Sequence, residues 1–266
     1  MTAGPLAYTY AVARHAAGLP QAVDGLAGVV GSPVHLVHAT HSGEVVAAVS
    51  PVPGKDFDEA ALRGHLEDLG WLEALARSHH GVVEALAACT TVVPLRLATV
   101  YLDNDRVRAM LDDRRGLFLD QLSRLAGHVE WGVKLYVDAP AATQAALPQG
   151  PDLSPGRDYL RRRRTEQASH QDAFRAAERA AERITASATS HAVGHVRHRV
   201  QGGELAVESG ANVLNDAYLV PLDQAEPFRA EVLRSTDALP GVHVVVTGPW
   251  APYSFADAGL AEDDAP

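Results

Sequence analysis

The amino-acid sequence predicts an α+β protein with two domains, one over residues 1–128 and one over residues 129–250. Three observations lead to this prediction. The chain has 266 residues, enough for one large or two small domains with a real core. Hydrophobic residues make up 47% and charged residues 21%, the composition of a soluble globular protein. Strand patterns and helix patterns are mixed in both halves of the chain.

The strands expected in the first domain lie within residues 8–50 and 90–102. YTYAVAR (8–14) predicts the first strand, and VHLVHA (34–39) and EVVAAVS (44–50) flank the turn signal THSG. TTVVPLRLATVYL (90–102) has β-branched and aromatic residues, but Pro94 excludes an unbroken central strand. We therefore expect a hairpin, followed later by a short strand or an extended crossover.

Two helices are expected between and after these strands. Apolar residues recur at spacings of three and four from Leu72 to Leu86, an amphipathic stripe that includes His79. Asp103 is a suitable N-cap for a second helix that extends to Leu125, and Gly116 is a candidate point of division within it.

The second domain begins with a strong strand signal, VEWGVKLYV (129–137). The segment 139–156 is rich in Pro, Ala and Gly and predicts a loop, after which a long helix begins at about Tyr159. The sequence does not fix where this helix ends, because HAVGHVRHRV (191–200) fits either its last turns or a strand.

The rest of the second domain continues with alternating signals. ELAVES (204–209) and AYLVPL (217–222) predict strands, Asp223 begins a short helix, and HVVVTG (243–248) is the last strand. The order from residue 129 is strand, helix, strand, strand, helix, strand. This order predicts a ferredoxin-like fold, an antiparallel sheet with two helices on one face.

Composition and charge exclude several classes of protein. The formal net charge is −10, which argues against a nucleic-acid partner because duplex-binding proteins are usually basic. No apolar run approaches the ~20 residues of a membrane span, and the first residues lack the pattern of a secretory signal. The lone Cys89 excludes a disulfide framework within the chain. We expect a cytoplasmic protein without a membrane partner.

Thirteen histidines raise the question of a metal site. His191, His195 and His198 would share one face if the long helix continued through them, and neutral imidazoles so arranged can bind zinc. No acidic or cysteine ligand lies in the same short motif, and Gly194 weakens the helix, so a solvated polar face is the preferred interpretation. For His79, on its apolar stripe, we prefer a core or interface histidine to a catalytic base.

Other motifs give no sign of an enzyme. The RRRR run at 161–164 fits a solvated face or a surface for an acidic partner better than a phosphate site. Cys89 is interpreted as a small buried residue. No Walker, Rossmann or G-x-S-x-G spacing is present. We therefore assign no catalytic, cofactor-binding or metal-binding residue and expect no cofactor.

The segment GPWAPYSF (248–255) concentrates aromatic residues near the end of the chain. Gly248 and Pro249 are expected to end the last strand, because proline and glycine interrupt ladder pairing. Burial of three aromatic side chains stabilises by up to roughly 5–9 kcal/mol in transfer terms. The segment should therefore dock either on its own protein, which we prefer, or on a partner. Residues 251–266 are expected to form a tail that packs back, with a loose acidic end.

Taken together, these elements resemble the gas vesicle protein family GvpL/GvpF over nearly the whole chain. The resemblance rests on YTYAV, HHGVVEAL, TTVVPLRLATVYLD, EWGVKLYV, GRDYLRRR, NVLNDAYLVPLD and the closing GPWAPYSF, in this order. The chain has Leu97-Ala98-Thr99 where the family often has Phe-Gly-Thr, and Ala251-Pro252 where it often has Pro-Pro. The motifs do not distinguish the F branch from the L branch.

The resemblance implies a two-domain protein whose second domain is a modified ferredoxin-like fold. It also implies a non-enzymatic accessory or minor structural role in building gas vesicles, with the small shell-forming protein and other vesicle proteins as partners. Some members are placed on the gas-facing side of the shell. The family-motif and packing residues in this sequence are His79, Pro94, Leu95, Arg96, Thr99, Glu130, Trp131, Gly156, Tyr159, Leu160, Tyr218, Leu219, Gly248, Pro249, Trp250, Pro252, Tyr253, Ser254 and Phe255.

A second function stays open on the residues alone. Ferredoxin-like scaffolds host many activities, so a small-ligand or metal-binding enzyme is the alternative to a vesicle assembly protein. The oligomeric state, the face that binds the shell protein and the position in the shell do not follow from the sequence.

Overall fold

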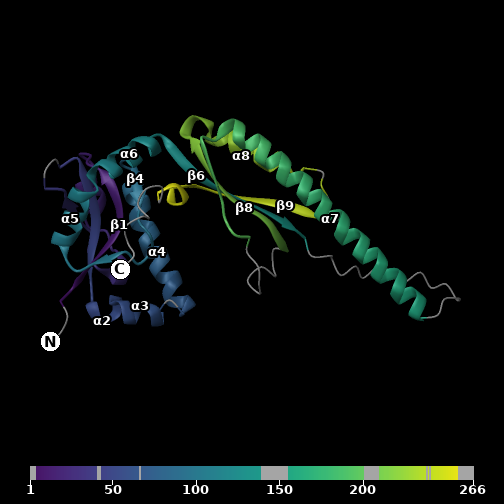
Figure 1. Cartoon of the computed structure of the whole chain (residues 1–266), viewed down its shortest axis with the longest axis horizontal. Helices are drawn as coiled ribbons and strands as arrows, with labels where there is room; N and C mark the ends of the chain where they lie inside the picture. Colours follow the sequence, from purple (N-terminus) through teal and green to yellow (C-terminus); the bar gives the residue numbers. More distant parts are fainter. Residues whose placement is uncertain are drawn as a thin grey trace. The chain divides into compact units, whose positions relative to one another are not determined.

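The chain forms two compact units in a computed structural model (Figure 1). Unit 1 contains residues 1–129 and 250–266, and unit 2 contains residues 130–249. The structure describes residues 4–40, 43–65, 67–138, 155–200, 210–237, 239 and 241–256, without the side chains of 155–162, 164–171 and 173. The division into domains 1–128, 129–250 and a tail 251–266, made from the sequence, remains a prediction.

Unit 1 is built on a five-stranded sheet in which β1 is central. The strands follow the order β2-β3-β1-β4, and β5 also pairs with β1. Every described pairing within this sheet is antiparallel. The strands are β1 (Leu6–Arg14), β2 (His35–His38), β3 (Val45–Val52), β4 (Val92–Pro94) and β5 (Val100–Tyr101).

Strand β1 contains a bulge and directs two tyrosines toward the site described below. The register between β1 and β3 shifts between Thr9 and Ala11. An extra residue in one strand breaks the simple alternation of side chains between the two faces. Tyr8 and Tyr10, two residues apart, share one face by this ordinary alternation, and beyond the bulge Ala11 and Ala13 join them in the same hydrophobic core. Two tyrosines from the central strand face one layer of the unit.

Helices cover both faces of this sheet (Figure 1). The core that contains Tyr8 and Tyr10 also contains buried residues of α4, whereas the opposite core contains buried residues of α5 and α6. Most of the apolar stripe predicted from Leu72 to Leu86 is confirmed as the buried face of α4, but Leu72 is half-buried and Ala76 is exposed. The helices are α1 (Leu19–Val23), α2 (Gly54–Phe57), α3 (Glu59–His65), α4 (Leu69–Ala87), α5 (Asn104–Asp113) and α6 (Arg115–Leu125).

Several local predictions in unit 1 are confirmed and one is wrong. The hairpin β2–β3 is present, β4 ends at Pro94, and Asp103 caps α5 by accepting a hydrogen bond from the Arg106 amide at 2.8 Å. The break between α5 and α6 lies at Arg114, not at Gly116. Arg114 has a non-helical backbone, while Gly116 continues α6.

Unit 2 has the strand order of a ferredoxin-like fold. Its sheet runs β7-β8-β6-β9, and the order of its element types is the predicted one, with Gly194–Arg197 as the second strand in place of 204–209. The α+β class with this second fold is confirmed. The elements are β6 (His128–Val137), α7 (Pro155–His191), β7 (Gly194–Arg197), β8 (Ala211–Pro221), α8 (Ala225–Arg234) and β9 (Val242–Trp250).

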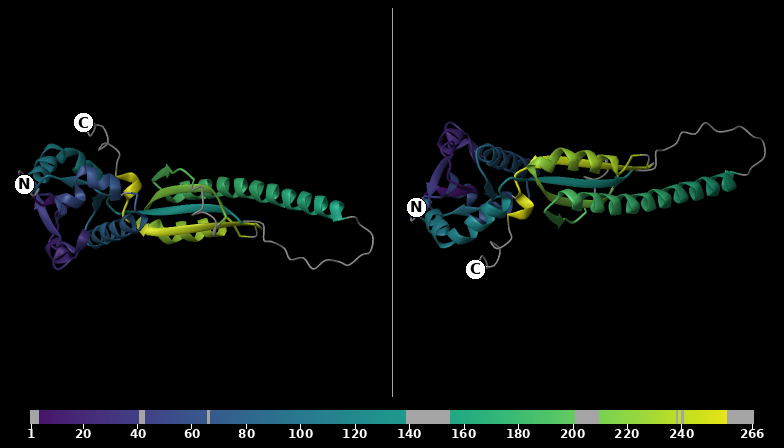
Figure 2. Two further views of the ribbon diagram at one scale, coloured as in Figure 1. Left: turned by 90° about the horizontal axis from the view of Figure 1, so that it is seen from below. Right: turned by 90° about the horizontal axis from the view of Figure 1, so that it is seen from above.

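The core of unit 2 lies between the sheet and the two helices. Trp131 of β6 and Tyr218 of β8 both pack against Phe228 of α8, with ring centroids 6.3 and 5.5 Å apart. Among the described side chains of α7, the buried ones are Ile184 and four alanines, whose small size lets a helix pack closely on a sheet. Figures 1 and 2 show that the N-terminal half of α7 extends past the end of the sheet.

The structure corrects the predicted bounds in unit 2. α7 begins at Pro155, four residues before Tyr159, because proline is well tolerated in the first turn of a helix. Of the two interpretations of HAVGHVRHRV, the strand holds for Gly194–Arg197, since the helix ends at His191. β9 does not end at Gly248 and Pro249 but continues to Trp250. It lies at an end of the strand order, and edge strands tolerate proline.

Some predictions fall outside the described residues: the strand at 204–209, the loop at 139–154 and the acidic end from residue 257. Among the helices that the structure describes, none is both long and apolar enough to cross a membrane.

Candidate binding pocket in unit 1

Helix α4 carries two adjacent histidines into the site. Asp68 caps the helix by accepting hydrogen bonds from the amides of Gly70 at 2.9 Å and Trp71 at 3.1 Å. His79 lies on the apolar stripe and is 3% exposed, so the prediction of a core histidine is confirmed. His80 is one residue further round the helix and is half-buried.

Tyr8 of β1 fixes the orientation of the buried histidine. The Tyr8 hydroxyl lies 3.0 Å from His79 Nδ1, and the Ala98 amide donates to the same hydroxyl oxygen at 3.1 Å. Of the two partners of this hydroxyl, the Ala98 amide can only donate, so the hydroxyl proton is assigned to Nδ1. The proton of the neutral imidazole then lies on Nε2.

Burial keeps both partners of this hydrogen bond neutral. Desolvation lowers the pKa of His79 to about 4, and the neighbouring His80 adds a smaller lowering effect. Desolvation also raises the pKa of Tyr8 well above its usual range. The pair is therefore an imidazole and a phenol at neutral pH, without a charge.

A second buried hydroxyl supports the same wall. Tyr10 packs on His79 with ring centroids 5.5 Å apart, and its hydroxyl lies 2.5 Å from Ser50 Oγ and accepts from the Val29 amide at 2.8 Å. A Cβ at Gly28 would lie 2.2 Å from this hydroxyl oxygen. Only glycine leaves room for the tyrosine at that point.

The turn after β4 forms the opposite wall. Arg96 and Thr99 close this turn, since the Thr99 hydroxyl donates to the Arg96 carbonyl at 2.7 Å. Ala98 within it has a φ of 63°, the left-handed region that favours glycine. This is the position at which the family often has glycine, so the alanine here holds a strained backbone conformation.

The C-terminal aromatic segment docks on this part of unit 1. Phe255 is 7% exposed, and its carbonyl accepts a hydrogen bond from Arg124 Nη2 at 2.7 Å. Pro252 is buried and Ser254 is half-buried. The Tyr253 hydroxyl lies 3.3 Å from His80 Nδ1, and Trp250 packs edge-on against the His80 ring at 5.1 Å.

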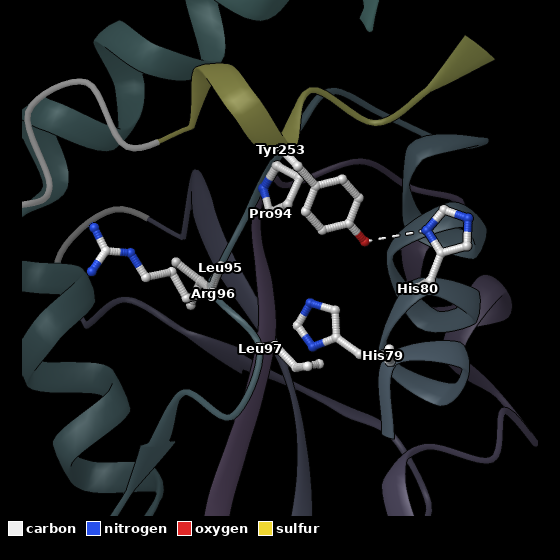
Figure 3. Close-up of a pocket in the computed structure, with 8 residues that line it drawn as sticks. His79, His80, Pro94, Leu95, Arg96, Leu97 and Tyr253 are labelled. Carbon is white, nitrogen blue, oxygen red and sulfur yellow. Dashed lines mark hydrogen bonds between the residues drawn. The ribbon is translucent and has the colours of Figure 1, made fainter. Parts of the chain in front are cut away.

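These three stretches enclose a pocket of about 420 Å³ (Figure 3). It is lined by Ala76, His79, His80, Pro94, Leu95, Arg96, Leu97 and Tyr253. The volume lies within the range of small-ligand sites, ~300–1,000 Å³. Figure 3 shows the His79 ring between Leu97 and Tyr253, with a ring nitrogen directed toward the enclosed space. The walls are mostly apolar, with a few polar groups that converge on the pocket.

The structure therefore brings many of the sequence-predicted residues together at one site in unit 1. Five of the eight lining residues were among them: His79, Pro94, Leu95, Arg96 and Tyr253. Sequence reasoning missed Tyr8 and Tyr10 as partners of His79. The signal available was two tyrosines at alternate positions of an otherwise apolar strand, an unusual use of buried polar groups.

Other predicted residues belong to unit 2. Glu130, Trp131, Tyr218 and Leu219 are buried there, and Pro249 is exposed. Gly248 has a φ of 131°, and a Cβ would lie 2.8 Å from the Glu130 carbonyl oxygen, so glycine is required. Gly156, Tyr159 and Leu160 lie in α7, and their side chains are outside the described part.

The three histidines considered as zinc ligands do not share a helical face. His191 ends α7 and bonds Gln224 at 3.1 Å and Glu231 at 3.0 Å; the glutamate raises the pKa of His191. His195 lies in β7, where Nε2 is 2.8 Å from the buried Asp216 carboxylate. Within the described ranges, no group of three potential ligands could hold a metal ion.

Two further interpretations are affected by the structure. Cys89 is exposed, so its interpretation as a buried residue is wrong; it lies just beyond the end of α4, outside the apolar stripe. In the RRRR run, the structure describes only the side chain of Arg163, which is exposed.

Comparison with known proteins decides the family. The chain matches the family described as gas vesicle synthesis protein GvpL/GvpF over residues 6–257. This chain belongs to the GvpL/GvpF family. It is 42% identical over 267 residues to gas vesicle protein L of Streptomyces sp. (strain CB03234), with 99% of this chain and 97% of that protein covered. Gas vesicle protein F of the same organism is 28% identical over 255 residues, covering 94% and 99%.

Solved GvpL/GvpF structures share the fold. The crystal structure of GvpF from Anabaena sp. PCC7120 superposes with a TM-score of 0.64 at 18% identity, covering 95% of this chain and 96% of that one. GvpF from Microcystis aeruginosa gives a TM-score of 0.62 at 19% identity, covering 94% and 98%. At sequence identities of 18% and 19%, this structural similarity shows a shared fold and nothing more specific.

Proposed function

We propose that this chain is a non-enzymatic accessory or minor structural protein of gas vesicles that binds the shell-forming protein and other vesicle proteins during nucleation and assembly. The observation that carries the proposal is the family match over residues 6–257, almost the whole chain. Under this proposal the protein acts in the cytoplasm, at the forming vesicle.

The chemistry of the pocket supports binding in preference to catalysis. An efficient general acid or base has a pKa close to the working pH. The pKa of His79 is lowered to about 4 and the pKa of Tyr8 is raised, so neither group exchanges protons readily near neutrality. These side chains are suited to hold a hydrogen-bond geometry.

The charge of the chain supports action at an early stage. A wall that faces gas must repel liquid water, so its exposed surface should be apolar. A protein with a formal net charge of −10 is better solvated by water than by gas or an apolar layer. We therefore favour nucleation, when the growing shell subunits still expose hydrophobic faces.

The proposal is tested by co-purification. The tagged full-length chain and the shell-forming protein are expressed together, and we expect the shell protein to be retained with the tagged chain. The control is an unrelated tagged protein of similar size and net charge. Equal retention by this control, or none by the chain, would contradict a specific interaction.

The timing is tested on mature vesicles. If the chain acts during nucleation, vesicles that have been washed should contain it at far less than one copy per shell subunit, as measured by quantitative mass spectrometry. Stoichiometric amounts in washed vesicles would contradict the nucleation role and favour a permanent wall component.

A further inference from the structure

The pocket contains a buried hydrogen-bond donor that the described part of the chain does not satisfy. His79 is 97% buried, and its Nε2 atom makes no well-formed hydrogen bond within the described residues. An interaction with the Leu95 backbone raises the pKa of His79, second in size to the lowering by desolvation, but the two groups do not meet the geometry of a hydrogen bond. Unpaired buried polar groups are costly, and each one calls for an explanation.

The polarity of this atom follows from its neighbours. Tyr8 directs its proton to Nδ1, so Nε2 carries the hydrogen of the neutral ring and acts as a donor. The adjacent His80 differs, because both of its nitrogens are engaged: Nδ1 with Tyr253 at 3.3 Å and Nε2 with Glu84 at 3.1 Å. Thus His79 is the member of the histidine pair that is available to a ligand.

The surroundings define what the donor would bind. The pocket is walled mainly by Ala76, Pro94, Leu95 and Leu97, so its occupant presents an apolar group. Arg96 also lines the pocket, but its guanidinium points away from His79 (Figure 3), so the neutral Nε2 donor is matched by an uncharged acceptor. An apolar residue of a polypeptide, with its own main-chain carbonyl, offers both features.

We propose that this pocket binds an apolar residue of the shell-forming protein, whose side chain fills the space beside Leu97 and whose main-chain carbonyl accepts a hydrogen bond from His79 Nε2. The inference rests on the proposed function, since it names the site on this chain at which the shell protein docks. Tyr253 then links the closing segment to partner binding, because it lines the same pocket.

The first test blocks the pocket from its rim. Ala76 and Ala74 are both exposed on α4, but only Ala76 lines the pocket. Ala76→Trp should weaken retention of the shell protein at least tenfold, while Ala74→Trp should retain it like the wild type. Melting temperatures of both variants confirm that they fold. If the Ala76→Trp variant retains as much shell protein as the wild-type chain, the inference is overturned.

The second test does not require the shell protein. The full-length chain, labelled with ¹⁵N-histidine, is titrated with N-acetyl-leucine N-methylamide, and the Nε2–H signal of His79 is followed by NMR. We expect a saturable shift with this probe, none with N-acetyl-serine N-methylamide, and none in Ala76→Trp. Absence of a shift at the highest soluble probe concentration overturns the pocket as a binding site.

The two tests separate failure of the site from failure of the function. If the wild-type chain retains no shell protein, the proposed function is wrong, and the NMR titration still decides whether the pocket binds an apolar residue. If the wild type retains the shell protein and Ala76→Trp does so equally, the function stands and the site assignment is overturned.

Discussion

At the scale of single residues, His79 connects the sequence pattern with the site. Its place on an apolar stripe predicts a core histidine, because the 3.6-residue period fixes which face a side chain occupies. Its partner Tyr8 lies 71 residues away on a strand, and the side that Tyr8 faces depends on the strand's place in the sheet. The helical period is a local pattern that the sequence shows directly. A contact between distant elements, such as His79 with Tyr8, depends on the tertiary fold and cannot be predicted from a local pattern.

The lowered pKa of His79 predicts a specific loss of stability in acid. The pKa is about 4 in the folded chain and 6.5 for an ordinary histidine, so the unfolded chain binds the proton more readily between these values. The stabilisation is complete above pH 6.5 and is lost as the pH falls toward 4. The full loss amounts to about 3 kcal/mol by linkage, of which about 2 kcal/mol falls between pH 7.0 and 4.5. Urea unfolding at pH 7.0 and 4.5 measures it.

The control for this experiment is His79→Gln, which has no titrating ring. The titratable side chains that face His79 are Tyr8, Tyr10, His80 and Tyr253, and all four are present in both proteins. Their contributions cancel in the difference between the two pH profiles. Parallel profiles would show that His79 is not held neutral by burial.

At the scale of elements, length decides what the sequence reveals. α4 has 19 residues and shows its period clearly, whereas α1, α2 and α3 have 5, 4 and 7 residues, too few for a periodic pattern. The order of elements in unit 2 was predictable because β6, α7 and β8 are long. β7 was ambiguous because four residues after a helix fit either state.

The N-cap of α4 predicts a measurable contribution to stability. Asp68→Ala removes the acceptor for the amides of Gly70 and Trp71 and should cost about 1 kcal/mol of unfolding free energy. Asp68→Ser keeps an acceptor at the cap and should retain most of this stability. Chemical denaturation of the three proteins gives the comparison. A serine variant as unstable as the alanine variant would refute capping as the cause.

At the scale of the whole chain, unit 1 is assembled from two distant stretches of sequence. The chain passes through unit 2 and its last described residues, 250–256, pack with residues 1–129. The aromatic residues of the closing segment predict that 251–266 packs back on the protein, but the sequence does not show which of the two units it joins. The family motifs can be recognised in order along the sequence. They line one pocket only because the closing segment packs on unit 1, where Tyr253 joins residues of α4 and of the turn after β4.

Two aromatic residues of the closing segment should differ in their effect. Phe255 is 7% exposed and its backbone is bonded to Arg124, whereas Trp250 is 37% exposed. Removal of a buried phenylalanine side chain costs about 3–5 kcal/mol, through lost transfer energy and a cavity. Phe255→Ala should therefore lower the unfolding free energy by about this amount, and Trp250→Ala by about 1 kcal/mol or less.

Measuring stability and shell-protein retention on both variants separates a latch from a recognition segment. A latch loses retention only as far as folding is lost, so Trp250→Ala should bind normally and Phe255→Ala should bind in proportion to its folded fraction at the assay temperature. Since Trp250 packs on His80 at the edge of the pocket, a stable Trp250→Ala protein with strongly reduced retention would instead make the exposed ring a direct contact for the partner.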